Sequence, residues 1–239
     1  MSSNSSNRGP GGLTTVGAKM LVALTGIGLI LFVIAHMLGN LQIFLGPEAL
    51  NNYAHKLKSM GPLLWVARIG LLAIFVTHLG LTLALTRRNT KARGGSVAEP
   101  QIKITGERYL NGYAYETATT ASRYMIHTGI LILIFVVYHL LHFTVMPDET
   151  VLMPTSELPN VYGMVIDGFE NVGIASLYIL AQLALASHIY HGASSCLQTL
   201  GLRTNTTKAG ISKLGLLLAL LIGLGNISIP IAVLANLIN

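Results

Sequence analysis

Five long apolar segments, separated by polar connections, dominate this chain of 239 residues. Each segment holds about 20 or more mainly apolar residues, the number that a helix needs to cross ~30 Å of hydrocarbon. The pattern predicts an all-α integral membrane bundle of five transmembrane helices, in a single membrane domain over residues 17–239. The predicted spans cover residues 18–45, 63–86, 123–146, 172–200 and 214–238.

The polar segments carry weaker signals. Residues 1–16 are rich in Ser, Asn and Gly, which predicts a mobile polar tail. The apolar run that follows this tail is too long for a cleavable signal peptide. Residues 48–62 form a polar connection with the character of a short interfacial helix, and residues 147–171 are expected to form an acidic loop.

Composition agrees with a membrane protein. The chain is 52% hydrophobic and 10% charged, whereas a soluble domain carries about 25% charged residues. The net charge of +6 comes from basic residues in connections without interleaved aromatics, which favours membrane topology over a nucleic-acid partner. The single cysteine, Cys196, rules out an internal disulfide and a c-type haem motif. The sequence contains no glycine-rich nucleotide-binding motif, so we expect no dinucleotide or flavin domain on this chain.

The distribution of Lys and Arg predicts the orientation in the membrane. The N-terminal tail and the second and fourth connections hold 12 such residues, with Lys19 and Arg123 counted at their edges. The first and third connections hold two, Lys56 and Lys58. Because basic residues collect on the cytoplasmic side, we expect a multi-pass protein of the cell inner (cytoplasmic) membrane. Its N-terminus is expected in the cytoplasm and its C-terminus outside.

The third predicted span contains ionisable side chains at membrane depth. It has no Asp, Glu, Lys or Arg between its ends, yet it carries His127, His139 and His142. An ionisable group inside a bilayer is costly and needs a partner, so each histidine is a candidate functional residue. The alternative is an ordinary buried histidine with its hydrogen bonds satisfied.

Sequence position converts to depth at about 1.5 Å per helical residue. On this scale His36 and His139 lie near the outer face, and His78 and His191 lie in the inner half. Each of these two depths thus holds two imidazoles. This arrangement predicts two haem b groups, each with its iron held by two histidines. Zinc is disfavoured because two ligands per depth are too few. A histidine-lined proton relay or transporter without haem stays open as an alternative.

A short repeat accompanies the outer pair. Thr25-Gly26-Ile27 precedes His36, and Thr128-Gly129-Ile130 precedes His139 at the same spacing. Ten residues of helix cover about 15 Å, which brings both glycines to the inner depth. Two explanations remain: the glycines let the inner macrocycle approach the backbone, or they aid helix packing in the membrane.

The whole chain resembles the dihaem cytochrome b subunit of succinate dehydrogenase and fumarate reductase, of the type with a single five-helix anchor. The Thr-Gly-x9-His-Leu stretch that ends at Leu140 resembles the third haem helix of that family. The stretch Ser187-His-Ile-Tyr-His-Gly192 resembles the fourth. The family alignment favours His139 over His142 and His191 over His188. Some members carry a glutamate where this chain has Ile189.

The resemblance implies roles for the histidines and their neighbours. His36 and His139 are expected to hold the outer haem, and His78 and His191 the inner haem. The candidates for contacts to haem propionates are His127, Arg123, Arg87 and Arg88. The candidates for a quinone site in the first connection are Glu48, Tyr53 and His55.

The same resemblance implies a function and partners. The chain is expected to pass electrons between a cytoplasmic iron–sulfur subunit, joined to an FAD flavoprotein, and menaquinone or another quinone in the membrane lipid. No dicarboxylate active site is expected on this chain. The alternatives are a haem b anchor of a hydrogenase or formate dehydrogenase, and the haem-free transporter.

Overall fold

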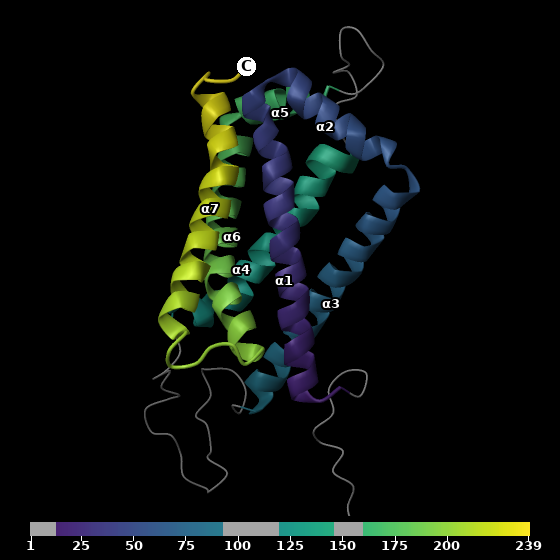
Figure 1. The fold of residues 1–239 in the computed structure, drawn as a ribbon. Coiled ribbons are helices and arrows are strands. Elements are labelled where there is room, and N and C mark those ends of the chain that lie inside the picture. Colours follow the sequence, from purple (N-terminus) through teal and green to yellow (C-terminus); the bar gives the residue numbers. More distant parts are fainter. Residues whose placement is uncertain (1–12, 93–119, 146–159) are drawn as a thin grey trace, which may run out of the picture.

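The computed structural model describes residues 13–92, 120–145 and 160–239, and this part of the chain is helical without a strand (Figure 1). Five of its helices are long and apolar enough to cross a membrane, which confirms the predicted all-α, five-span architecture. They are α1 (Thr15–Asn40), α3 (Pro62–Ala92), α4 (Thr120–Leu140), α6 (Val172–Thr199) and α7 (Lys208–Leu234). A 3-10 turn η3 (Leu41–Leu45) extends α1, and a π-helical turn η4 (Leu141–Val145) extends α4.

Four of the five spanning helices begin earlier than the sequence pattern predicted, α3 by one residue, α1 and α4 by three and α7 by six. The first starts at Thr15 because the Thr14 side chain accepts a hydrogen bond from the Gly17 amide and caps it. The last starts at Lys208 and ends at Leu234, several residues ahead of the predicted span 214–238. Of the predicted mobile tail, residues 1–12 lie outside the described part of the chain.

Two shorter helices cover one end of the bundle. The polar connection after η3 forms α2 (Pro47–Ser59), which confirms the expected short helix. The expected acidic loop contains a helix that the sequence did not predict, α5 (Val161–Glu170). Figure 1 shows both helices at the end where the C-terminus lies. We call this the capped end.

Side-chain amides join the two covering helices. Asn51 of α2 is buried, and its Nδ2 donates to Oδ1 of Asn160 at 2.9 Å. The Asn51 Oδ1 accepts from the Tyr162 amide, also at 2.9 Å. A buried amide is tolerated only when its donors and acceptors are paired. The pairing therefore fixes α5 against α2.

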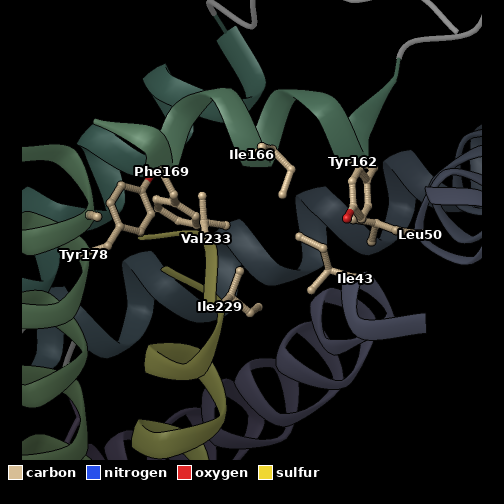
Figure 2. Close-up of a cluster of buried hydrophobic side chains, with 9 residues drawn as sticks. Ile43, Leu50, Tyr162, Ile166, Phe169, Tyr178, Ile229 and Val233 are labelled. Atoms are coloured by element: carbon tan, nitrogen blue, oxygen red, sulfur yellow. The ribbon is translucent and has the colours of Figure 1, made fainter. Parts of the chain in front are cut away.

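An apolar cluster lies beneath these helices. Figure 2 shows Tyr162 beside Leu50, and Phe169 beside Tyr178 of α6. The Phe169 and Tyr178 rings meet edge to face, with their centroids 4.9 Å apart. The cluster of buried residues is made of Ile43, Leu50, Tyr162, Ile166, Phe169, Ala175, Tyr178, Ile229 and Val233. Its burial anchors the capped end to the transmembrane helices.

Helices α1 and α6 form the centre of the bundle, because α1 packs against α3, α6 and α7, and α6 packs against α1, α4 and α7. Small residues bring α6 and α7 close together. A Cβ at Gly215 would lie 2.9 Å from the Tyr190 carbonyl oxygen, and one at Gly223 would lie 3.1 Å from Cβ of Ala186. Such small-residue contacts are the usual route to tight helix packing in membranes.

Helices α3 and α4 lie at the periphery. The first packs against α1 and the second against α6. The most apolar windows of these two helices contain no buried residue, whereas those of α1, α6 and α7 do. The end opposite the capped end carries cationic side chains, and we call it the basic end. Its basic residues whose side chains the structure describes are Lys19, Arg87, Arg88, Arg203, Lys208 and Lys213.

Candidate functional site

A threonine on α1 holds a histidine on α3. The Thr25 Oγ1 lies 3.2 Å from Nδ1 of His78, and it also lies 2.6 Å from the Leu21 carbonyl oxygen. A hydroxyl has one hydrogen, and the carbonyl can only accept it. The Thr25 oxygen therefore accepts from His78, so the imidazole carries its hydrogen on Nδ1. Its Nε2 keeps a lone pair, which is the form that binds a metal.

The second half of the chain repeats this arrangement. The Thr128 Oγ1 lies 3.0 Å from Nδ1 of His188 on α6 and 3.0 Å from the Met125 carbonyl oxygen. The same argument places the hydrogen of His188 on Nδ1 and leaves its Nε2 with a lone pair. His78 and His188 lie near each other across the bundle. We call these two residues the His78 level.

The glycines of the repeat lie beside the same imidazoles. A Cβ at Gly26 would lie 3.2 Å from Cε1 of His78, and one at Gly129 would lie 3.5 Å from Cε1 of His188. Each glycine thus gives room to the histidine ring of the neighbouring helix. This close approach explains why small residues follow Thr25 and Thr128 in both halves.

The histidine that Thr128 contacts at this level is His188, whereas the family resemblance favours His191 as the haem ligand. His191 lies three residues further along α6, about 4.5 Å nearer the basic end. It lies on the side of Arg203, at the turn after α6. His188, by contrast, has the same relation to Thr128 as His78 has to Thr25.

His36 and His139 face each other near the capped end, and we call them the His36 level. Their ring centroids are 5.7 Å apart and the ring planes are nearly perpendicular, at 83°. Two imidazoles on opposite sides of one metal, with bonds of about 2.0 Å, place their centroids roughly 6 Å apart. Each ring stacks on an aromatic one turn earlier, Phe32 at 5.5 Å and Phe135 at 5.8 Å. The pairing that depth predicted is therefore present.

The His36 ring also contacts its own helix. The Asn40 Nδ2 lies 3.2 Å from Nε2 of His36 and donates to it. The acceptor nitrogen is again Nε2, so the hydrogen of this imidazole is on Nδ1. Binding of a metal at Nε2 would replace the Asn40 contact, which makes His36 the one ligand candidate that an amide already engages.

Tyr178 on α6 connects two histidines of α4 and η4, and the sequence reading missed it. Its hydroxyl lies 2.9 Å from Nδ1 of His142 and 3.4 Å from Nδ1 of His139. The ring is buried. The hydroxyl can donate to the nearer His142 and accept from His139, which leaves Nε2 of His139 with a lone pair. A tyrosine inside an apolar span needs such a partner, and this need was the available signal.

The other predicted site residues are dispersed. On α4, His127 is exposed beside Tyr124, with the ring centroids 5.8 Å apart. The side chain of Arg123 lies outside the described residues. Glu48 and His55 are exposed on α2, and Tyr53 packs against Gly39 of α1, where a Cβ would lie 2.6 Å from its ring. Tyr53 thus contacts the helix that carries His36.

Two guanidinium groups at the basic end have a buried nitrogen without a hydrogen-bond partner among the described residues. They are Nη1 of Arg88 and Nε of Arg203. The Nη1 of Arg203 donates to Oε1 of Gln198 at 2.8 Å, whereas the neighbouring Arg87 is exposed. Arginines of this kind are suited to carboxylate or phosphate groups.

The donor set fits haem better than a free metal ion. In the part of the chain that the structure describes, no three His, Cys, Asp or Glu side chains converge on one ion. A haem needs only two axial ligands from the protein, since the porphyrin supplies the others. The His36 and His78 levels each offer two imidazoles with Nε2 as the acceptor nitrogen. Comparison of the chain with family models, with curated proteins and with solved structures finds no match.

Proposed function

We propose that this chain is the dihaem cytochrome b membrane anchor of a succinate:quinone oxidoreductase. The observation that carries the proposal is the repeated hydrogen bond from His78 and His188 to the hydroxyl oxygens of Thr25 and Thr128. Metal-binding histidines usually donate their other ring N–H to a fixed acceptor, which sets the tautomer and the ring orientation. In this bundle of membrane-spanning helices, the hydroxyl oxygens of Thr25 and Thr128 are the fixed acceptors.

Four histidines hold the two haems in this proposal. His36 and His139 bind one, and His78 and His188 bind the other. When bound, each haem supplies one-electron redox chemistry. The chain orients the ligands through Thr25, Thr128 and the Tyr178 hydroxyl. An N–H···O bond to a ligating imidazole also raises its basicity, so these hydroxyls influence the redox potential.

The surface charges support an orientation and a docking face. The basic end faces the cytoplasm by the rule that Lys and Arg collect there, which puts the capped end outside in the cytoplasmic membrane. An iron–sulfur subunit and its flavoprotein dock on the basic end through complementary charge. The buried nitrogens of Arg88 and Arg203 offer hydrogen bonds to anionic groups at the basic end, such as haem propionates.

Purification of the tagged chain from the membranes of its native host tests this function. We expect iron–sulfur and flavin subunits to copurify, and succinate to reduce a b-type absorbance in the preparation. Reduction by hydrogen or formate, but not by succinate, would assign the chain to a hydrogenase or formate dehydrogenase. A colourless preparation would contradict the haem proposal and favour a histidine-lined transporter.

A further inference from the structure

The part of α3 nearest the capped end stands clear of the other helices. Every residue from 62 to 70 except Leu64 is exposed, and a Cβ at Gly70 would meet no atom within 4 Å. Further along α3, by contrast, Ile74 lies 3.7 Å from the position of a Cβ at Gly28 of α1. Figure 1 shows α3 diverging from α1 toward the capped end. Protein leaves this segment of a membrane-spanning helix uncovered, so lipid surrounds it.

Arg68 is the one charged residue of this segment, and its side chain is directed toward the capped end. It follows Pro62, where α3 begins, by about 9 Å along the helix. Side chains of an α-helix tilt toward its N-terminus, and the guanidinium carbon lies 5.2 Å from the centre of the Trp65 ring. The Trp65 side chain is 61% exposed and shares one face with the exposed Ile69 and Leu72. The cation therefore extends along the lipid-facing side of α3 toward the membrane surface.

The turn from α2 into α3 adds further positive charge. Lys56 and Lys58 lie in the last turn of α2, and both are exposed. An arginine at membrane depth needs an anionic partner, yet the sequence of α3 contains no Asp or Glu. Glu48 lies in the first turn of α2, about 15 Å along that helix from Lys58. The other carboxylates of the described residues, Asp167 and Glu170, lie on α5.

We propose that the headgroup of an anionic phospholipid binds at this place, which we call the α2–α3 corner and define by Lys56, Lys58, Trp65 and Arg68. The Arg68 guanidinium donates to the phosphate oxygens, the pairing that its planar donors suit. The acyl chains lie along the exposed apolar face of α3, and Trp65 lies at the membrane interface, as tryptophan commonly does.

The charges of the corner decide which phospholipid it prefers. Lysines close to a membrane surface attract lipids of net negative charge. A zwitterionic phosphatidylcholine offers the same phosphate, but its own cation opposes Lys56 and Lys58. The α2–α3 corner should therefore prefer phosphatidylglycerol over phosphatidylcholine. Such a site does not depend on the haem proposal.

The fluorescence of Trp65 tests the site directly, because it is the single tryptophan of the chain. The purified full-length chain is placed in phosphatidylcholine vesicles that contain brominated phosphatidylglycerol or, at the same mole fraction, brominated phosphatidylcholine. Bromine quenches an indole that it contacts. We expect phosphatidylglycerol to be preferred by about fivefold, the attraction that one basic residue has for anionic lipid. Arg68→Gln should remove most of this preference, and Arg68→Lys should keep part of it.

Lys19→Gln is the matched control, since it removes an exposed cation from the basic end and should leave the preference unchanged. Quenching is expressed relative to the same variant in unbrominated vesicles, which cancels quenching by haem. Equal quenching by the two lipids, or an Arg68→Gln variant with the full preference, would overturn the proposal. Quenching by neither lipid would also overturn it, because protein would then cover Trp65. Haem content, measured on the same samples, tests the proposed function separately.

Discussion

Thr25 on α1 accepts a hydrogen bond from His78 on α3, with 3.2 Å between Oγ1 and Nδ1. The hydrogen of the hydroxyl is already given to the Leu21 carbonyl, so the imidazole has a single tautomer. The Thr128–His188 pair repeats this relationship between α4 and α6. Two helix pairs thus present the same ligand geometry, one from each half of the chain.

Replacing either threonine by valine keeps the shape and removes the acceptor. In Thr25→Val and Thr128→Val we expect haem at the His78 level to be retained about 10- to 100-fold more weakly, as for other lost partners of metal-bound histidines. Thr86→Val is the matched control, since its hydroxyl bonds to the Thr82 carbonyl. Haem loss during dilution, followed by absorbance, measures the effect. Equal retention in all three variants would contradict a role for these hydroxyls.

The choice between His188 and His191 has a direct test. We expect His188→Ala to lose one of two haems, because it removes a ligand that Thr128 orients. His191→Ala should keep both, since this side chain lies toward Arg203. Haem per chain, measured on purified protein, separates the two variants. Loss of a haem in His191→Ala alone would restore the assignment that the family resemblance favoured.

Replacing the buried Gln182 by an apolar residue should not lower the stability of the folded protein. The Gln182 side chain is buried in α6, and its Oε1 has no hydrogen-bond partner among the described residues. A buried acceptor without a partner costs about 1–3 kcal/mol, so Gln182→Met should be neutral or stabilising. Asn51→Leu should instead destabilise, because it breaks the bonds to Asn160 and Tyr162. Thermal unfolding in detergent compares them. A large loss of Tm in Gln182→Met would refute the prediction.

The proposed orientation has an energetic consequence. Electrons from cytoplasmic succinate that reach quinone near the capped end move toward the positive side of an energised membrane. The potential assists them by ~2.3 kcal/mol per charge per 100 mV, or roughly 4.6 kcal/mol for two electrons. In energised vesicles, an uncoupler should therefore slow succinate-to-menaquinone transfer and leave activity with a soluble acceptor unchanged. Equal rates with and without uncoupler would place the quinone site at the basic end.

The spans were predictable because a bilayer demands about 20 apolar residues from each crossing helix. Depth along the helix also predicted the facing pair His36 and His139. The sequence pattern did not predict helix α5, because two glycines among its ten residues lower its helix propensity. Contacts with α2 and the buried cluster stabilise it instead, and those contacts come from distant parts of the chain.

The details of the candidate site depend on how helices are rotated against each other. The repeat containing Thr25 and Thr128 was visible in the sequence, but the partner of each hydroxyl lies on another helix. The same limit applies to His188 and His191, which differ by less than one helical turn. The π-helical turn η4 has no sequence signature, so the position of His142 against Gly168 was not predictable either.

Haem quantified per chain in the purified wild-type protein, together with its reduced-minus-oxidised spectrum, tests the central claim most directly. Four histidines, two at the His36 level and two at the His78 level, predict a b-type spectrum and two haems per chain. One haem would contradict the assignment of ligands at one of the two levels. A protein without haem would contradict the proposed function as a whole.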